Sequence, residues 1–342
     1  MDFTRRDLGK LALAAWPASR LLEAKPNSNF GGVQVGVITY SYRSMPGAND
    51  AKELLKYIVD SGVSGIELMG PAAEIYAGSP AGAGRGPGGG GGGQGRAPGA
   101  PGAGGGGQGR GQGGGGGRQQ MTPEQQAAQR SRAEELKKWR LSVPMDKYKE
   151  LRSMYNEAGV NIYAFKLEPN PNMSDEEYEY IFHVADTLGA NHVTLELSNN
   201  AEFTQRIGDF AAKKHMVVAY HAHTQATISA WDAVLAQSKG NAINLDCGHY
   251  VAGTSESPIP VILKHHDRIA SVHLKDRKKA SNGGDNLPWG QGETPIHDIL
   301  QLMRKEKYNF PASIELEYQI PEGSDAVVET SKCVQFCKNA LA

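Results

Sequence analysis

The 342-residue chain carries 36 lysines and arginines against 37 aspartates and glutamates, which gives a net charge of -1 at pH 7. This balance gives no bulk electrostatic reason to expect nucleic acid or an anionic membrane as a partner. The three cysteines, Cys247, Cys333 and Cys337, are too few for a disulfide framework or a cysteine-based zinc cluster.

The N-terminus places Arg5 and Arg6 before a short apolar run from Leu11 to Trp16. This pattern is typical of a twin-arginine export signal, and a basic amphipathic helix is the alternative. The run is too short to span a bilayer, which takes about 20 apolar residues. We therefore expect an export signal over residues 1–27, a periplasmic location and no membrane anchor.

From Val33 onward, strand-like and helix-like patterns alternate along the chain. Eight strand patterns, each followed by a helical one, predict a closed (β/α)8 barrel, that is, an α/β TIM barrel, as a single domain over residues 28–342. The expected helices cover residues 51–60, 203–214, 227–237, 259–266 and 295–305, with others starting near Met145, after Ser174 and after Ser324.

A glycine-dominated stretch interrupts this alternation after the second strand. It runs from Gly78 to Arg118, contains four arginines and has no acidic residue, and we take residues 78–120 as an insertion. Because this composition has too little to bury to offset the entropy of ordering, it is predicted to be disordered. Binding of RNA or another polyanion is the alternative, but the stretch has few arginines and no aromatic residue to stack on bases.

Histidine and aspartate, which are common metal ligands in proteins, lie at the ends of the later strand patterns. The segment MVVAYHAHT carries His221 and His223, INLDCGHY carries Asp246 and His249, and ASVHLKD carries His273. Alternate side chains of a strand share a face, and the C-terminal ends of parallel strands carry the chemistry of α/β barrels. Imidazoles and carboxylates together suit Mn, Zn, Co or Fe, so these strand ends predict a metal site.

The order of these motifs resembles the xylose isomerase-like sugar phosphate isomerase/epimerase superfamily. The resemblance rests on the YHxH segment, the D-x-x-H pair, the HLKD run, the Trp289-Gly-Gln-Gly stretch and Glu315 on the last strand. It implies one divalent metal ion (Mn, Zn, Co, Mg or Fe) held by Asp246, His273 and Glu315, with Glu317 a less favoured alternative to Glu315.

The fourth ligand stays open in the sequence. Many members of the superfamily carry a metal-binding glutamate on the fifth strand, where this chain has His221. Either His221 binds the metal, or Glu196 from the fourth strand replaces the missing carboxylate, or both bind.

The resemblance implies abstraction of a proton next to a carbonyl through an enediolate that the metal stabilises. Return of the proton would isomerise or epimerise a sugar, and loss of a β-substituent would make the enzyme a lyase or dehydratase. Glu196 and His223 are the candidate base and acid. The candidate substrate-binding residues are Lys166, His249, Lys275, which is otherwise a rim lysine, and Trp289, which is otherwise a loop anchor.

Two other classes compete with this interpretation. Apurinic endonucleases of the same superfamily share the D-x-x-H pair but need further histidines, and none occurs here between His273 and His297. A sugar-binding barrel without catalysis is the non-enzymatic alternative. We expect a small carbohydrate as the partner and no nucleic acid, and we leave a homo-oligomer open.

Overall fold

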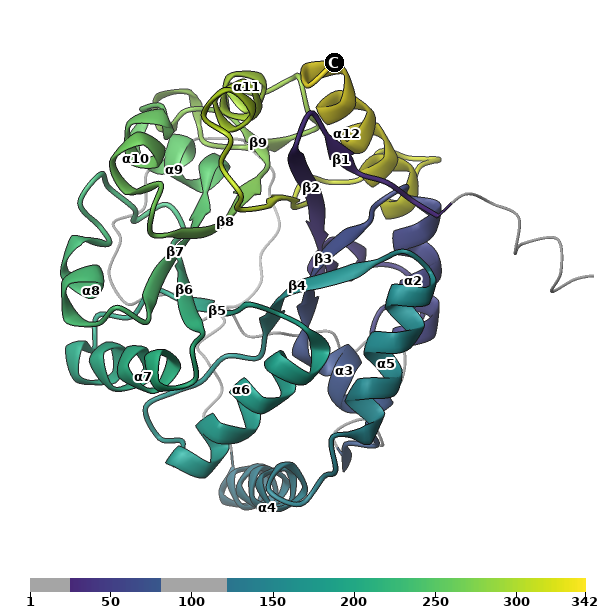
Figure 1. The fold of residues 1–342 in the computed structure, drawn as a ribbon, viewed down its shortest axis with the longest axis vertical. Coiled ribbons are helices and arrows are strands. Elements are labelled where there is room, and N and C mark those ends of the chain that lie inside the picture. The colour runs from purple at the N-terminus through teal and green to yellow at the C-terminus, as the bar shows by residue number, and fades with distance from the viewer. Residues whose placement is uncertain (1–24, 81–121) are drawn as a thin grey trace, which may run out of the picture.

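The computed structural model describes residues 25–80 and 122–342. In these residues, parallel strands form a closed ring and helices surround it, as Figure 1 shows. Most of the predicted export signal (residues 1–24 of 1–27) and most of the predicted glycine-rich insertion (81–120 of 78–120) lie outside the described residues. Within the described ranges, no helix combines the length and the apolar character that crossing a membrane requires.

The ring closes because β2 pairs with β3 on one side and with β11 on the other. Its strands are β2 Val33–Ile38, β3 Gly65–Met69, β4 Asn161–Lys166, β5 His192–Glu196, β6 Val217–His221, β7 Asn241–Asp246, β8 Ile269–Leu274 and β11 Ala312–Ile314. Each pairs in parallel with its neighbours, which confirms the predicted (β/α)8 barrel. A short strand, β1 (Asn29–Phe30), adds to β2 in antiparallel orientation.

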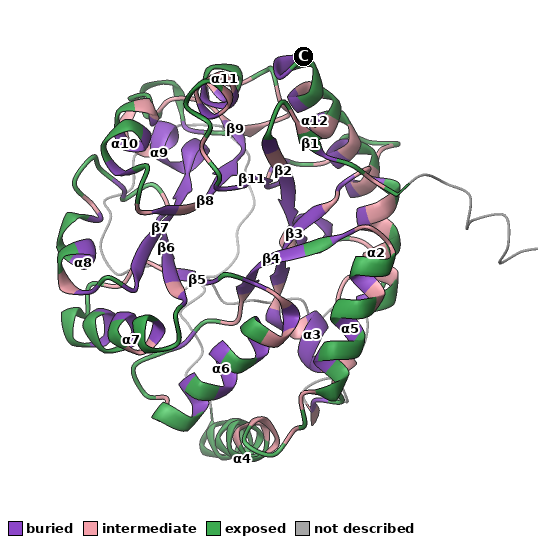
Figure 2. Cartoon of the chain, viewed as in Figure 1, coloured by how far each residue is buried: buried purple, intermediate pink, exposed green. Residues whose placement is uncertain are grey.

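Helices cover the outside of the ring, and most of them bury the side that faces it, as the burial colouring of Figure 2 shows. They are α2 Ala51–Asp60, α3 Gly70–Tyr76, α4 Pro123–Arg140, α5 Asp146–Glu157, α6 Asp175–Leu188, α7 Ala201–Lys213, α8 Asp232–Gln237, α9 Cys247–Thr254, α10 Ile259–His265, α11 Ile296–Glu306 and α12 Ala326–Ala340. Two short 3-10 helices, η2 Thr39–Tyr42 and η4 Ala280–Asn282, and the hairpin of β9 Asp276–Arg277 with β10 Asn286–Leu287 complete the described elements.

Local sequence signals explain where the helices begin. The side chain of Asp50 accepts hydrogen bonds from two backbone N–H groups at the start of α2, and Leu54 and Ile58, one turn apart, bury its inner face. Each such buried side chain contributes about 1.5–3 kcal/mol of apolar burial. The predicted capping box at Ser174 is present at α6, and a second box at Thr122 starts α4.

Several predicted strands are shorter in the structure, and β6 ends at His221, so His223 lies beyond it. The segment INLDCGHY leaves the sheet at Asp246 because Asp246 caps a helix, α9, that the sequence analysis did not predict. The last strand ends at Ile314, so Glu315 and Glu317 lie beyond it. Helix α8 starts at Asp232, five residues later than expected.

The interior of the ring is more polar than the expected apolar packing of a barrel. Buried Glu67 and Thr194 are hydrogen-bonded to each other, and the hydroxyl of buried Ser271 bonds both His192 and Asn244. Since buried polar groups are costly unless they are hydrogen-bonded, this connected network is stable only with its partners in place.

Candidate metal centre

Four neighbouring strands each deliver one metal-type ligand to the same point inside the ring. His221 ends β6, Asp246 ends β7, His273 lies near the end of β8, and Glu315 follows directly on β11. One ligand atom from each of the four lies within 4.8 Å of the others, and all four residues are buried. We call these four residues the inner group.

Asp246 belongs to the inner group and is also the N-cap of α9. Its Oδ1 accepts the backbone N–H of His249 at 2.7 Å, which fixes the carboxylate. Its Oδ2 is buried and accepts no hydrogen bond, although Lys275 Nζ lies 2.9 Å away and His221 Nε2 3.8 Å away. Burial alone would raise the pKa of Asp246, but His249 and Lys275 lower it to about 2, so the carboxylate is ionised and pairs with the Lys275 ammonium.

His273 lies between two carboxylates. Its Nε2 is 2.7 Å from Glu67 Oε2 and its Nδ1 is 2.8 Å from Glu315 Oε2. Burial alone would lower the pKa of His273, but Glu67 and Glu315 outweigh it and raise the pKa to about 10. Burial would likewise raise the pKa of Glu67, and the charge of His273 reverses this and lowers it to about 2. Without metal, the ring is therefore an imidazolium that neutralises part of the inner group.

The donors of the inner group fit one divalent cation. Two carboxylates and two imidazoles are ligands that suit Mn, Fe, Co and Zn. Ligand atoms bonded at about 2.0–2.2 Å to one ion lie up to about 4.4 Å apart, close to the observed span. Burial lowers the pKa of His221 to about 4, so this ring is neutral near pH 7, as metal binding requires.

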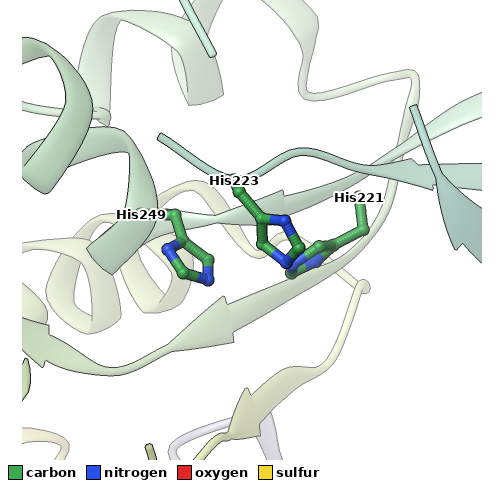
Figure 3. Close-up of side chains that lie close together, drawn as sticks. All are labelled: His221, His223 and His249. Atoms are coloured by element: carbon green, nitrogen blue, oxygen red, sulfur yellow. The ribbon is translucent and has the colours of Figure 1, made fainter. Parts of the chain in front are cut away.

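A second set of imidazoles lies next to the inner group and shares His221 with it (Figure 3). It adds His223 and His249, which we call the outer histidines. Both ring nitrogens of His249 face cations, because Nε2 is 3.0 Å from Lys275 Nζ and Nδ1 contacts the Arg277 guanidinium. A neutral imidazole accepts at only one nitrogen, and two cations oppose a third, so the inner group suits a metal better.

Lys275 is buried at the centre of the site and is not a rim lysine. Its Nζ lies 2.9 Å from Asp246, 3.0 Å from Glu315 and 2.7 Å from Glu317, and the residue is 2% exposed. A side chain at Gly248 would place its Cβ 2.3 Å from Lys275 Cγ, so the glycine allows α9 to pack against this lysine. The single ammonium group offsets part of the negative charge of these three carboxylates.

Glu196 and His223 form a more exposed pair beside the inner group. Glu196 Oε1 accepts a hydrogen bond from Lys166 Nζ at 3.1 Å, and its Oε2 lies 3.8 Å from His223 Nδ1. Burial would raise the pKa of Glu196, but His221 and Lys166 outweigh it and lower the pKa. Glu196 is thus an ionised carboxylate outside the inner group, and its predicted roles as base or ligand stay predictions.

Trp289 is the last of the predicted site residues, and it lies in a loop outside the inner group. Trp289 packs edge-on against Phe336 of α12, the position of a loop anchor, and its role in sugar binding stays a prediction. The loop that carries it is held by Asp276, whose carboxylate accepts the backbone N–H groups of Gly290 and Gly292. Gly292 must be a glycine, since a Cβ there would lie 2.2 Å from the Asp276 carboxylate.

Sequence reasoning missed three residues that contact the site. Glu67 and Asn244 touch the imidazoles of the inner group, and Arg277 touches His249. A signal for Glu67 was present, because a carboxylate inside the apolar strand segment GIELM is rarely buried without a partner. The sequence contains no such signal for Asn244. Its position opposite His221 follows only from the register between β6 and β7.

The sequence of this chain matches a known family of barrel proteins. A family model described as xylose isomerase-like TIM barrel matches residues 132–335, which is more than half of the chain. The chain belongs to this family. The match spans the strands from β4 to β11, and so includes every residue of the inner group.

Similarity to individual proteins of known activity is weaker. An inosose dehydratase from Clostridium botulinum is 27% identical over 172 residues, which cover 44% of this chain and 57% of that protein. One from Clostridium tetani is 26% identical over 136 residues, 38% of this chain and 39% of that protein. The matches thus span roughly two fifths to three fifths of these relatives.

Solved structures of this family share the fold. The probable 3-DHS dehydratase AsbF from Bacillus anthracis has a TM-score of 0.55 and 13% identity, with 88% of this chain and 98% of that chain covered. The 3-keto-D-glucoside 4-epimerase YcjR from E. coli has a TM-score of 0.52 and 11% identity, with 89% and 100% covered. At these identities the likeness concerns the fold alone.

Proposed function

We propose that this protein is a divalent-metal-dependent enzyme that removes a proton next to a carbonyl of a small carbohydrate and returns it to give an isomer or epimer. The observation that carries the proposal is the buried inner group with the ionised Glu196 and His223 beside it. The family contains proteins named as sugar epimerases, such as the 3-keto-D-glucoside 4-epimerase, which supports a carbohydrate as the substrate.

The residues that would hold the metal are His221, Asp246, His273 and Glu315. When bound there, the ion supplies Lewis-acid polarisation of the substrate's carbonyl oxygen, which acidifies the neighbouring C–H. A bound ion would compete with Lys275 Nζ, 2.9 Å away, for Asp246 Oδ2, and His273 would release one proton on binding.

In the reaction, Glu196 acts as the base and His223 as the acid. The carboxylate of Glu196 is already ionised, and Lys166, 3.1 Å away, keeps it so and limits its orientations. Its side chain is 35% exposed and that of His223 is 28% exposed, so a substrate has access to both. The base takes the proton from the carbon next to the carbonyl, and the acid returns a proton to this carbon or to its neighbour.

Elimination of water is the second candidate reaction. It is favoured by the two clostridial inosose dehydratases among the relatives of this chain. The first step is the same: a base breaks the C–H bond next to the carbonyl. The β-hydroxyl then leaves as water with a proton from the acid, and a carbon–carbon double bond forms.

Solvent exchange separates the two reactions in one experiment. The protein, loaded with Mn²⁺ or Zn²⁺, is incubated in D2O with a panel of keto-sugars and inososes, and products are followed by NMR. Deuterium at the carbon next to the carbonyl, with an epimer or isomer as product, would support the first proposal. An unsaturated product with release of water would favour dehydration, and saturable binding without exchange would leave only a sugar-binding barrel.

We also propose that the protein is exported, on the basis of Arg5 and Arg6 before the apolar run from Leu11 to Trp16. Replacing both arginines by lysine should move the protein from the periplasmic to the cytoplasmic fraction of the producing cell. An unchanged distribution would contradict the proposal.

A further inference from the structure

A layer of buried polar residues lies beneath the inner group, toward the centre of the barrel. Glu67 on β3, Thr194 on β5 and Asn244 on β7 each have no exposed surface. Glu67 does not belong to the inner group, and a buried carboxylate costs several kcal/mol unless its hydrogen bonds offset the loss of water. The directions of its hydrogen bonds determine which nitrogen of the neighbouring histidine carries a proton.

An ionised carboxylate only accepts hydrogen bonds, so every polar group that contacts Glu67 must donate. Thr194 donates its hydroxyl to Oε1 at 2.6 Å. His273 Nε2 lies 2.7 Å from Oε2, so this ring nitrogen carries a proton. Asn244 Nδ2 donates to the same oxygen at 3.3 Å, so the nitrogen end of the amide faces Glu67.

The orientation of Asn244 then sets the second histidine. The amide nitrogen faces Glu67 and Ser271 Oγ, and it also lies 3.2 Å from His273 Nε2, which cannot accept from it while that nitrogen donates to Glu67. The amide oxygen Oδ1 then faces His221 Nδ1, 3.1 Å away. Because an amide oxygen only accepts, His221 Nδ1 must carry the proton of that neutral ring. Asn244 and His221 are direct partners in the register of β7 and β6, so the backbone holds this contact.

Each ring thus keeps its other nitrogen for the metal. For His273 this is Nδ1, 2.8 Å from Glu315 Oε2, and for His221 it is Nε2, 3.8 Å from Asp246 Oδ2. We propose that Glu67 is a positioning residue that sets the tautomers of both histidines, His273 directly and His221 through Asn244. The two rings then bind one ion through different nitrogens.

This inference rests on the metal site of the proposed function and is independent of the substrate and the reaction. A metal-bound histidine almost always donates its other ring N–H to an acceptor, and Asn244 supplies that acceptor for His221.

The direct test is NMR of the full chain labelled with 15N-histidine and loaded with Zn²⁺. Two-bond nitrogen–proton couplings report which nitrogen of each zinc-bound ring carries the proton. We expect one zinc-bound ring with the proton on Nε2 and one with the proton on Nδ1. Two zinc-bound rings of the same tautomer would overturn the inference while leaving the metal site standing. A wild-type protein that takes up no zinc would overturn both.

Variants of Glu67 provide a second readout. Loss of an outer partner of a metal-bound histidine typically lowers metal affinity 10–100-fold, and we expect this range for Glu67→Gln in a zinc titration against a chelating dye. Thr194→Val, which frees one oxygen of Glu67, should cause a smaller loss and serves if Glu67→Gln does not fold.

Glu74→Gln is the matched control. Glu74 is also a buried glutamate, but it pairs with Arg140 at 2.7 Å, between α3 and α4. Its replacement should lower the melting temperature and leave zinc affinity unchanged. If Glu67→Gln lowers stability in the same way and binds zinc as tightly as the wild type, Glu67 is only structural.

Discussion

The inner group and the outer histidines lie side by side and share His221, yet they differ in the charge of their neighbours. In the inner group, His273 lies between the carboxylates of Glu67 and Glu315. Among the outer histidines, His249 contacts the cations Lys275 and Arg277, and its nearest carboxylate oxygen, from Glu317, lies farther away, 3.4 Å from Nε2. The residue type is the same in both, so histidine clustering alone does not identify a metal site. The sign of the surrounding charge does.

The pKa values express the same contrast. Glu67 and Glu315, against the effect of burial, raise the pKa of His273 to about 10, whereas burial, helped by Lys275, lowers that of His249 to about 2. The inner group therefore attracts positive charge, as a proton or a metal ion. Around His249, the cations Lys275 and Arg277 oppose a further positive charge, whereas His223 lies 3.8 Å from the Glu196 carboxylate.

The largest effect is expected from Glu196→Gln, which tests whether the acid–base pair is separate from the inner group. Loss of a general base typically slows proton transfer by about 10²–10⁴-fold, so deuterium exchange should fall by this factor. Zinc affinity should not change. Glu168→Gln is the control, because Glu168 also contacts Lys166, at 3.5 Å. A large loss of zinc affinity in Glu196→Gln would instead make Glu196 a ligand.

Lys275→Met removes the cation that lies between the inner group and the outer histidines. Leaving buried carboxylates without their partner typically costs about 3–5 kcal/mol, so the metal-free variant should be strongly destabilised. Divalent metal should restore part of this loss, and the melting temperature should rise more on zinc addition than in the wild type. An equal rise in both proteins would show that Lys275 does not compete with the metal.

The pH dependence of stability provides a third and smaller test. The pKa of His273 is raised from 6.5 to about 10 in the folded protein, so its proton stabilises the fold fully below about pH 6.5. As pH rises toward 10, this contribution is lost, at up to about 1.4 kcal/mol per pH unit. In denaturant titrations of metal-free protein, His273→Gln should lose this slope.

His192→Gln is the control for that experiment. His192 is also buried, but burial lowers its pKa to about 4, so it is neutral throughout this pH range. Its replacement should leave the slope between pH 6.5 and 10 in place. Equal slopes in the wild type and His273→Gln would mean that the two carboxylates do not hold a proton on His273.

Much of the architecture could be predicted from the sequence, because a parallel barrel repeats one simple unit. The alternation of strand and helix patterns predicted the barrel, and the order of its histidines and carboxylates predicted the family. Asp246, His273 and Glu315 do meet inside the ring, with His221 as the fourth member of the inner group. Strand periodicity determines which side chains share a face, and that is what gathers these ligands.

Contacts that depend on tertiary structure could not be predicted in this way. The D-x-x-H pair looked like the end of a strand, whereas Asp246 caps α9 through the backbone of His249. Lys275 looked like a rim residue, and its burial depends on the close packing of Gly248. Glu67 lies on β3, far in sequence from His273, and only the closed ring joins them.

The measurement that tests the account most directly is the metal content of purified protein, in the wild type and in variants of each set. We expect about one equivalent of Mn, Fe, Co or Zn in the wild type, lost in Asp246→Asn and His273→Gln and kept in His223→Gln and His249→Gln. Asn at position 246 can still cap α9, so metal loss there would report the missing charge. Metal that is lost from the His249 variant and kept in the Asp246 variant would place the ion among the outer histidines and contradict the account.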